Sequence, residues 1–183
     1  PYIKTTTQTS SNLKTNHIRN NTMVGAVAGT PGTDPTNWLI NEGGASSTIV
    51  GTGTDSDGIE YIDIRFFGTP TSDPDVRFEG TNSVRAISTD IFTVSTYASI
   101  IAGDLTNITN IRLGGFERDS GGGFEADKTD TITLTSTLTQ YSVTKTLDDA
   151  DTTHYQPMVV VNSVVGGSSG AIDITLRIGL PQM

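Results

Sequence analysis

At 183 residues the chain is long enough for one domain with a substantial buried core and too short for two ordinary domains with linkers. Its formal charge is −9, and no stretch gathers Lys or Arg into a cluster, which argues against nucleic acid as a partner. The absence of cysteine excludes a disulfide framework and a thiolate metal site. No run approaches the roughly 18 apolar residues of a membrane helix, so we expect no membrane insertion.

The first segment in chain order, residues 1–15, is polar and Thr-rich and has no sustained period. We expect an N-terminal arm or linker there. Because Pro1 stands where a complete protein would begin with methionine, we expect a processed product or a piece of a longer protein. The sequence predicts one domain over residues 16–183.

Short β-branched runs separated by Gly, Pro, Asp and Asn recur along this domain, which is typical of β-sandwiches and barrels. No segment has a helical stripe. The predicted strands are 16–23, 37–41, 47–53, 59–67, 75–80, 91–100, 107–118, 130–136, 139–147, 154–162 and 171–180. The predicted fold class is therefore all-β, a two-sheet antiparallel β-sandwich in which each sheet has one dry and one solvated face.

The predicted strand 59–67 has two distinct faces. Its apolar parity carries Ile62, Ile64 and Phe66. Its other parity carries Tyr61, Asp63 and Arg65, spaced about 7 Å apart along the strand. An aromatic ring beside planar carboxylate and guanidinium groups suits the ring face and adjacent hydroxyls of a sugar. These three residues are thus candidate glycan-binding residues.

Further candidates for the same site lie on other predicted strands: Tyr97, Arg112, Glu117 and Gln156. They join it if the register places them on the same face. Two alternatives remain open, namely that Asp63 and Arg65 pair with charges across the strands, or that the face is a subunit interface. A binder should leave Tyr61 or Tyr97 at least half exposed in a groove.

Three other features have simpler expected roles. Trp38, at the start of a predicted strand, is expected to pack in the core. The acids of residues 53–60 are expected to form a tight turn rather than a calcium loop. In the Gly-rich stretch 114–130, we expect a local charge cluster at the mouth of a hairpin, with Phe116 and Phe124 packing across it.

The sequence also lacks the common catalytic motifs. It has no Gly-x-Ser-x-Gly elbow, and neither His17 nor His154 has an evident acid or nucleophile partner. The remaining enzymatic alternative is a glycosidase pair such as Asp63 with Glu117. We therefore expect a non-catalytic protein.

Three stretches, "NNTMVGAVAGTPGTDPTNW", "GIEYIDIRFFGTP" with "GDLTNITNIRLGGFERDSGG", and "AIDITLRIGLPQ", resemble the carbohydrate-binding-module-like jelly-roll domains of bacteriophage and prophage tail-fibre, spike and virion surface proteins. The resemblance covers residues 18–183. It implies a jelly-roll glycan-binding or adhesion domain at the virion surface or otherwise extracellular. The implied partners are a cell-surface polysaccharide, other virion subunits and, in a homotrimer, further copies of the chain.

The layout is also similar to binding modules of secreted enzymes, in which acids near the first and last strands often hold a structural calcium. That resemblance implies Asp173 as one calcium ligand, although the usual early Glu is missing here. Two alternative functions follow from the same fold. One is a purely structural decoration or assembly domain without sugar binding, and the other is the carbohydrate-binding module of a secreted polysaccharide hydrolase.

Overall fold

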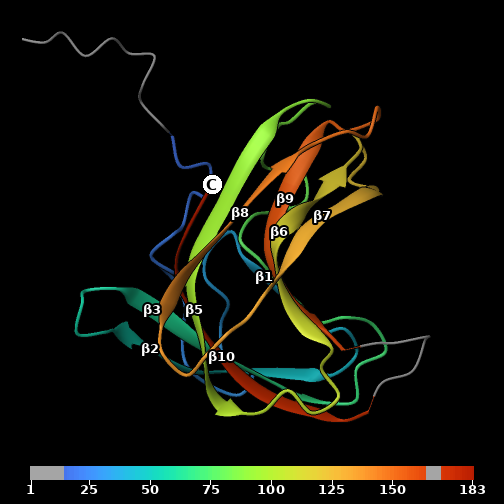
Figure 1. Cartoon of the computed structure of the whole chain (residues 1–183). Coiled ribbons are helices and arrows are strands. Elements are labelled where there is room, and N and C mark those ends of the chain that lie inside the picture. The colour runs from blue at the N-terminus through green and yellow to red at the C-terminus, as the bar shows by residue number, and fades with distance from the viewer. Residues whose placement is uncertain (1–14, 164–169) are drawn as a thin grey trace, which may run out of the picture.

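The computed structural model describes residues 15–163 and 170–183, so the expected arm lies almost wholly outside the described residues. Within these ranges the protein is a sandwich of two antiparallel five-stranded sheets (Figure 1). The described residues contain no helix, and hence none long and apolar enough to cross a membrane. The predicted all-β jelly-roll sandwich is confirmed.

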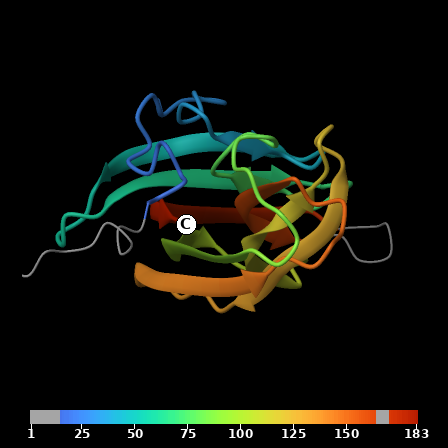
Figure 2. The same ribbon diagram turned by 90° about the horizontal axis from the view of Figure 1, so that it is seen from above.

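The ten strands alternate irregularly between the two sheets. Sheet A has the order β1-β4-β9-β6-β7 and contains β1 (Leu39–Asn41), β4 (Asp75–Arg77), β9 (His154–Asn162), β6 (Asn110–Arg118) and β7 (Phe124–Ile132). Sheet B has the order β2-β3-β10-β5-β8 and contains β2 (Ser46–Thr54), β3 (Glu60–Gly68), β10 (Ile172–Gln182), β5 (Ile91–Gly103) and β8 (Thr139–Thr146). Figure 2 shows β2, β3 and β10 running side by side.

Apolar residues at every second position of β3 and β10 form the core side of sheet B. Cross-strand partners on this side are Ile62 with Ile178, Ile64 with Leu176, and Phe66 with Ile174. All six side chains are fully buried. Paired apolar residues on adjacent strands are the unit that stabilises a sheet, so the register of β10 follows from this match.

Two sequence predictions about strands are corrected. Residues 16–23 form no strand, because the chain turns there with Met23 at a φ of 54°, and Asn20 bonds to the backbone of its own turn instead of a partner strand. Strand β7 begins at Phe124, six residues before the predicted 130–136. Its polar surface residues hid the alternation.

The expectation of one dry and one solvated face fails for β9, where every residue from His154 to Val161 is buried. Its core-facing residues include Tyr155, Val159 and Val161. The residues of the opposite face of β9, which include Gln156 and Met158, are buried as well, and Arg118 of β6 is hydrogen-bonded to Gln156 there. This second covered layer is the part of the fold that positions the candidate site.

Burial of Tyr155 has a consequence at alkaline pH. Burial, with a smaller contribution from Asp127, Glu117 and Asp130, raises the pKa of the Tyr155 phenol. The unfolded phenol ionises near pH 10, whereas the folded one stays neutral, so stability is complete below that pH and decreases above it. We expect Tyr155→Phe to reduce this alkaline loss by up to about 1.4 kcal/mol per pH unit. Urea unfolding of both proteins between pH 9 and 11 measures the difference, and parallel curves would contradict it.

Candidate functional site

The outer face of sheet A, which points away from the core, presents a dense set of planar polar side chains and aromatic rings. The register aligns Arg112 with Val160 and Asp75, and Gly114 with Met158 and Arg77. It also aligns Phe116 with Gln156 and Asp127, and Arg118 with His154 and Phe124. On β6 the site residues share one parity, so the strand itself brings Arg112, Phe116 and Arg118 together.

A braced guanidinium lies near one end of this face. Arg118 donates from Nε and Nη2 to Gln156 Oε1, at 3.2 and 2.9 Å. Gln156 is fully buried, and its Nε2 donates to the carbonyl of Glu79 at 3.2 Å and to Thr81 Oγ1 at 3.3 Å. The amide is therefore held from behind, and it holds Arg118 in turn.

Two phenylalanines frame Arg118. Phe116 and Phe124 meet edge to face, with ring centroids 5.2 Å apart. The Arg118 guanidinium carbon lies 5.3 Å from the Phe116 centroid and 5.9 Å from that of Phe124. Phe124 is 56% exposed, which leaves an aromatic surface open to solvent beside a fixed cation. The prediction that these two rings pack across the hairpin is confirmed.

Further along the face, two more arginines are paired with acids. Arg77 binds Asp75 through two contacts of 2.6 and 3.0 Å, and Asp75 also accepts a hydrogen bond from Asn41 Nδ2. Arg112 binds the carboxylate of Asp127 through Nη1, and its Nε is buried without a hydrogen-bond partner in the described part of the chain. The face thus combines fixed donors, fixed acceptors and one exposed ring.

The outer face of sheet B carries the strand singled out in the sequence. Asp63 is bound there by Arg177 of β10, with contacts of 2.8 and 2.9 Å. Arg177 also covers the ring of Tyr61, with 3.5 Å from its guanidinium carbon to the centroid. Arg65 binds Asp173 in the same two-pronged way, at 2.8 and 2.7 Å. The cross-strand charge pairing considered as an alternative is present.

The predicted site residues are divided between surfaces. Tyr61, Asp63, Arg65 and Tyr97 lie on the outer face of sheet B, where Gly179 separates the two tyrosines. Neither tyrosine is half exposed. Arg112 and Gln156 lie on the outer face of sheet A instead. The sugar-binding role of each of these residues stays a prediction, since position alone does not test it.

Glu117 lies on neither of the two outer faces. It has the opposite parity to Arg118 on β6 and is fully buried. It accepts hydrogen bonds from Thr152 Oγ1 and from the backbone N–H groups of Asp148 and Asp149, and pairs with Lys128 at 3.2 Å. Because these contacts hold it inside the protein, Glu117 does not join Asp63 in a shared site.

Several residues of the sheet A face are not among the predicted site residues: Asp75, Arg77, Phe116, Arg118 and Phe124. A usable signal was present in β6, because Phe116 and Arg118 share the parity of Arg112 while Glu117 does not. The predicted strand 75–80 carried the same signal, because Asp75 and Arg77 alternate there with the buried Val76 and Phe78.

Metal binding has two possible locations among the described residues. The one group of three suitable side chains there is Glu125, Asp149 and Asp151, whose donor atoms lie within 4.8 Å of one another. Partial burial, together with Asp149, Asp119 and Asp151, raises the pKa of Glu125. Asp173 lies outside this group and is engaged by Arg65. Its role as a calcium ligand stays a prediction.

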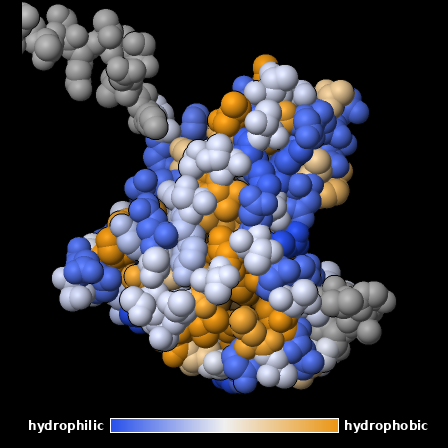
Figure 3. All heavy atoms as spheres, in the orientation of Figure 1, coloured by the Kyte–Doolittle hydropathy of each residue, from blue (hydrophilic) through white to orange (hydrophobic). Residues whose placement is uncertain are grey.

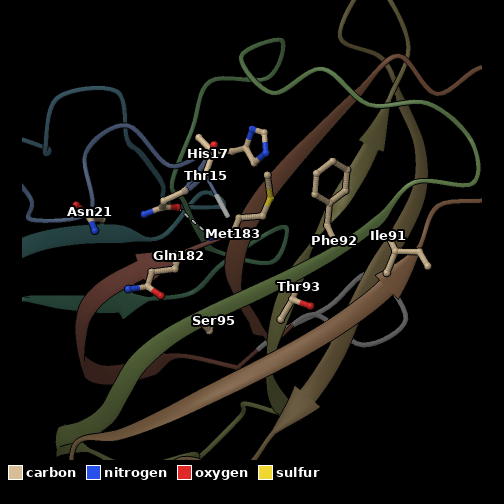
Figure 4. A pocket seen from close by; sticks show the side chains of 10 residues that line it. Thr15, His17, Asn21, Ile91, Phe92, Thr93, Ser95, Gln182 and Met183 are labelled. Atoms are coloured by element: carbon tan, nitrogen blue, oxygen red, sulfur yellow. Dashed lines mark hydrogen bonds between the residues drawn. The ribbon is translucent and has the colours of Figure 1, made fainter. Parts of the chain in front are cut away.

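A separate open hollow of about 690 Å³ lies beside the start of β5 and the end of β10 (Figure 4). Phe92 lies in its wall, edge to face with His17 at 6.0 Å and stacked on Tyr155 at 5.3 Å. The other described wall residues have neutral side chains: Thr15, Asn16, Asn21, Ile91, Thr93, Ser95, Gln182 and Met183. It has none of the braced ionic groups found on the sheet A face.

Trp38 and the acids of residues 53–60 behave as expected. Trp38 is 6% exposed and donates from Nε1 to the carbonyl of Asn20 at 2.8 Å. Asp55 Oδ1 accepts from the backbone N–H groups of Asp57 and Ile59, which closes a tight turn. Hydrophilic residues cover most of the view in Figure 3, with apolar residues in a broken band down its middle.

Comparison with known proteins defines the fold. No family model and no curated protein matches the chain. A solved structure described as "CBM4 structure and function" aligns with a TM-score of 0.54 and 18% identity, covering 90% of this chain and 99% of that one. An arabinose-bound MgGH51 α-L-arabinofuranosidase aligns with a TM-score of 0.55 and 12% identity over 80% of this chain, but over only 23% of its own length. The chain shares the β-sandwich fold of these structures.

Proposed function

We propose that this protein is a non-catalytic glycan-binding domain and that the outer face of sheet A binds the sugar. The observation that carries the proposal is the exposed Phe124 ring beside Arg118. Phe116 packs against the Phe124 ring, and Gln156 holds the Arg118 guanidinium by two hydrogen bonds. The likeness in fold to a CBM4 structure, a carbohydrate-binding module, supports it.

The geometry suits a sugar because its parts are already ordered. An exposed aromatic ring can lie under the C–H face of a pyranose, while planar side chains bind pairs of adjacent hydroxyls. Arg77 and Asp75 fix each other, as do Arg118 and Gln156. Groups fixed before binding lose little conformational entropy on contact, which raises affinity for a given set of contacts.

The test is a glycan-array screen of the wild type followed by titration of the best ligand. We expect Phe124→Ala to weaken binding at least about tenfold, through loss of ring contact, with an unchanged melting temperature. Phe67→Ala is the matched control, since Phe67 is a partly exposed ring under Arg65 on the other sheet. It should bind like the wild type.

A third variant, Tyr61→Ala, distinguishes the two sheets. Loss of binding in Tyr61→Ala, with full binding in Phe124→Ala, would place the site on sheet B, where the sequence predicted it. If the assembled protein binds no glycan at all, the structural decoration function is supported in place of adhesion.

We propose in addition that the domain works outside the cell, displayed in several copies. The resemblance of its sequence stretches to phage fibre and spike domains supports a virion surface, where a homotrimer and neighbouring subunits would be its partners. Shallow sites bind weakly, and display of several copies raises the avidity by orders of magnitude. The same fold also serves a module of a secreted polysaccharide hydrolase. The parent gene decides between them, because a hydrolase module would adjoin a catalytic domain.

A further inference from the structure

Arg118 differs from the other buried or half-buried arginines of the described residues because it has no carboxylate partner. Arg77 pairs with Asp75, Arg112 with Asp127, and Arg177 with Asp63. Arg118 is only 9% exposed, yet its hydrogen bonds within the described chain go to the neutral amide of Gln156. A guanidinium removed from water without a counter-ion is unfavourable unless a ligand supplies one.

The residues around Arg118 do not supply the negative charge that its guanidinium lacks. Burial lowers the pKa of Arg118, and the nearby Arg77 lowers it further, with Asp75 acting in the opposite direction. Both carboxylate oxygens of Asp75 already accept hydrogen bonds from Nε and Nη2 of Arg77, and Asp75 makes no hydrogen bond to Arg118. An anion bound here would therefore gain attraction from a site that is locally positive.

The guanidinium retains free donors on an accessible edge. Nη1 makes no hydrogen bond to any described residue. It is also absent from the set of fully buried polar atoms that lack a partner, so solvent reaches it. The exposed Phe124 ring lies beside the same guanidinium, with 5.9 Å from the guanidinium carbon to the ring centroid. A sugar stacked on Phe124 would bring a substituent of its ring toward Nη1, and a planar carboxylate is the group that matches a guanidinium edge.

We propose that the sheet A face selects acidic glycans, with the carboxylate of a uronic acid residue bound to Arg118 and its ring on Phe124. This inference rests on the proposed glycan-binding function and names the substrate class. The chain's formal charge of −9 repels polyanions at long range, so selection depends on short-range pairing. At about 0.15 M salt the Debye length is about 8 Å, and the direct contact dominates.

The experiment compares a polyuronate with its carboxyl-reduced form, which has the same linkages but no charge. Wild-type protein at physiological salt should bind the acidic form at least tenfold more tightly. Arg118→Met should lose this preference and bind both forms alike, while Arg118→Lys should keep part of it. Arg65→Met, which removes a paired arginine from the opposite sheet, is the control and should retain the full preference.

The wild-type comparison needs no variant and so does not depend on whether Arg118→Met folds. Equal or tighter binding of the reduced form by the wild type would overturn the acidic-glycan inference while leaving glycan binding intact. A preference that persists in Arg118→Met would overturn it too, as would selection of a sulfated polysaccharide over the polyuronate. Absence of binding to every glycan would overturn this inference and the proposed function together.

Discussion

Replacing Glu117 by alanine is expected to destabilise the protein by about 3–5 kcal/mol, because it removes one partner from a buried ionic network. Glu117 is fully buried and bonded to Lys128, Thr152 and two backbone N–H groups. Without the carboxylate, Thr152 and the two backbone N–H groups lose their acceptor inside the protein, and Lys128 keeps only its pairing with Asp148. Urea unfolding monitored by tyrosine and tryptophan fluorescence measures the loss.

Glu125 offers the matched control, since it is one residue of the acidic group near the same end of the sandwich. Its neighbours are like charges, so Glu125→Ala should leave the free energy of unfolding within about 0.5 kcal/mol of the wild type or raise it. Equal losses in both variants would mean that the Glu117 network contributes nothing specific.

The Glu117 network also predicts that the protein loses stability in acid. Burial raises the pKa of Glu117, but the hydrogen bonds from Thr152, Asp148, Lys128 and Asp149 together outweigh it and hold the pKa below its usual 4.5. A depressed folded pKa means that the contribution of Glu117 is complete above about pH 4.5 and is lost as the pH decreases through the folded value. Glu117→Gln should flatten that part of the stability profile.

Gly114→Ala should destabilise the protein by about 3–5 kcal/mol, combining backbone strain with a steric clash. Gly114 lies in the middle of β6 with a φ of 143°, a conformation that residues with a side chain rarely adopt. A Cβ there would lie 2.3 Å from the carbonyl oxygen of Lys128 on β7. The strands would have to separate beneath the sheet A face.

Gly58→Ala is a control that introduces backbone strain at a positive φ without a steric clash. Gly58 has a φ of 81°, but a Cβ built there meets no atom within 4 Å. Its replacement should cost only about 1 kcal/mol. Thermal unfolding of the two variants side by side tests the difference, and similar melting temperatures would show that β7 accommodates the added methyl group.

The sandwich was predictable from sequence where one physical signal dominated. In β3 and β10, apolar residues at every second position place Ile62, Ile64, Leu176 and Ile178 in the core, as the alternation indicated. The signal failed in β7, whose residues are all at least partly exposed, so that polar side chains occupy both parities. It also failed for residues 16–23, where Asn20 and the positive φ of Met23 belong to a turn.

The candidate site was less predictable because it depends on which strands are neighbours. Alternation places Arg112 and Tyr61 on outward faces, but only the strand order shows that these are faces of different sheets. The partners of Asp63 and Arg65 likewise come from β10, more than a hundred residues away. Pairing at that separation leaves no local trace in the sequence.

The central place of β10 in sheet B has a consequence for how the protein is made. Within this sheet, the β2-β3 pair and the β5-β8 pair both attach to β10, which is the last strand. Until residues 172–182 have been synthesised, each pair presents an unsatisfied strand edge. Such edges are the ones that neighbouring nascent chains and chaperones recognise. Folding of the sandwich is therefore completed only after translation of its final strand.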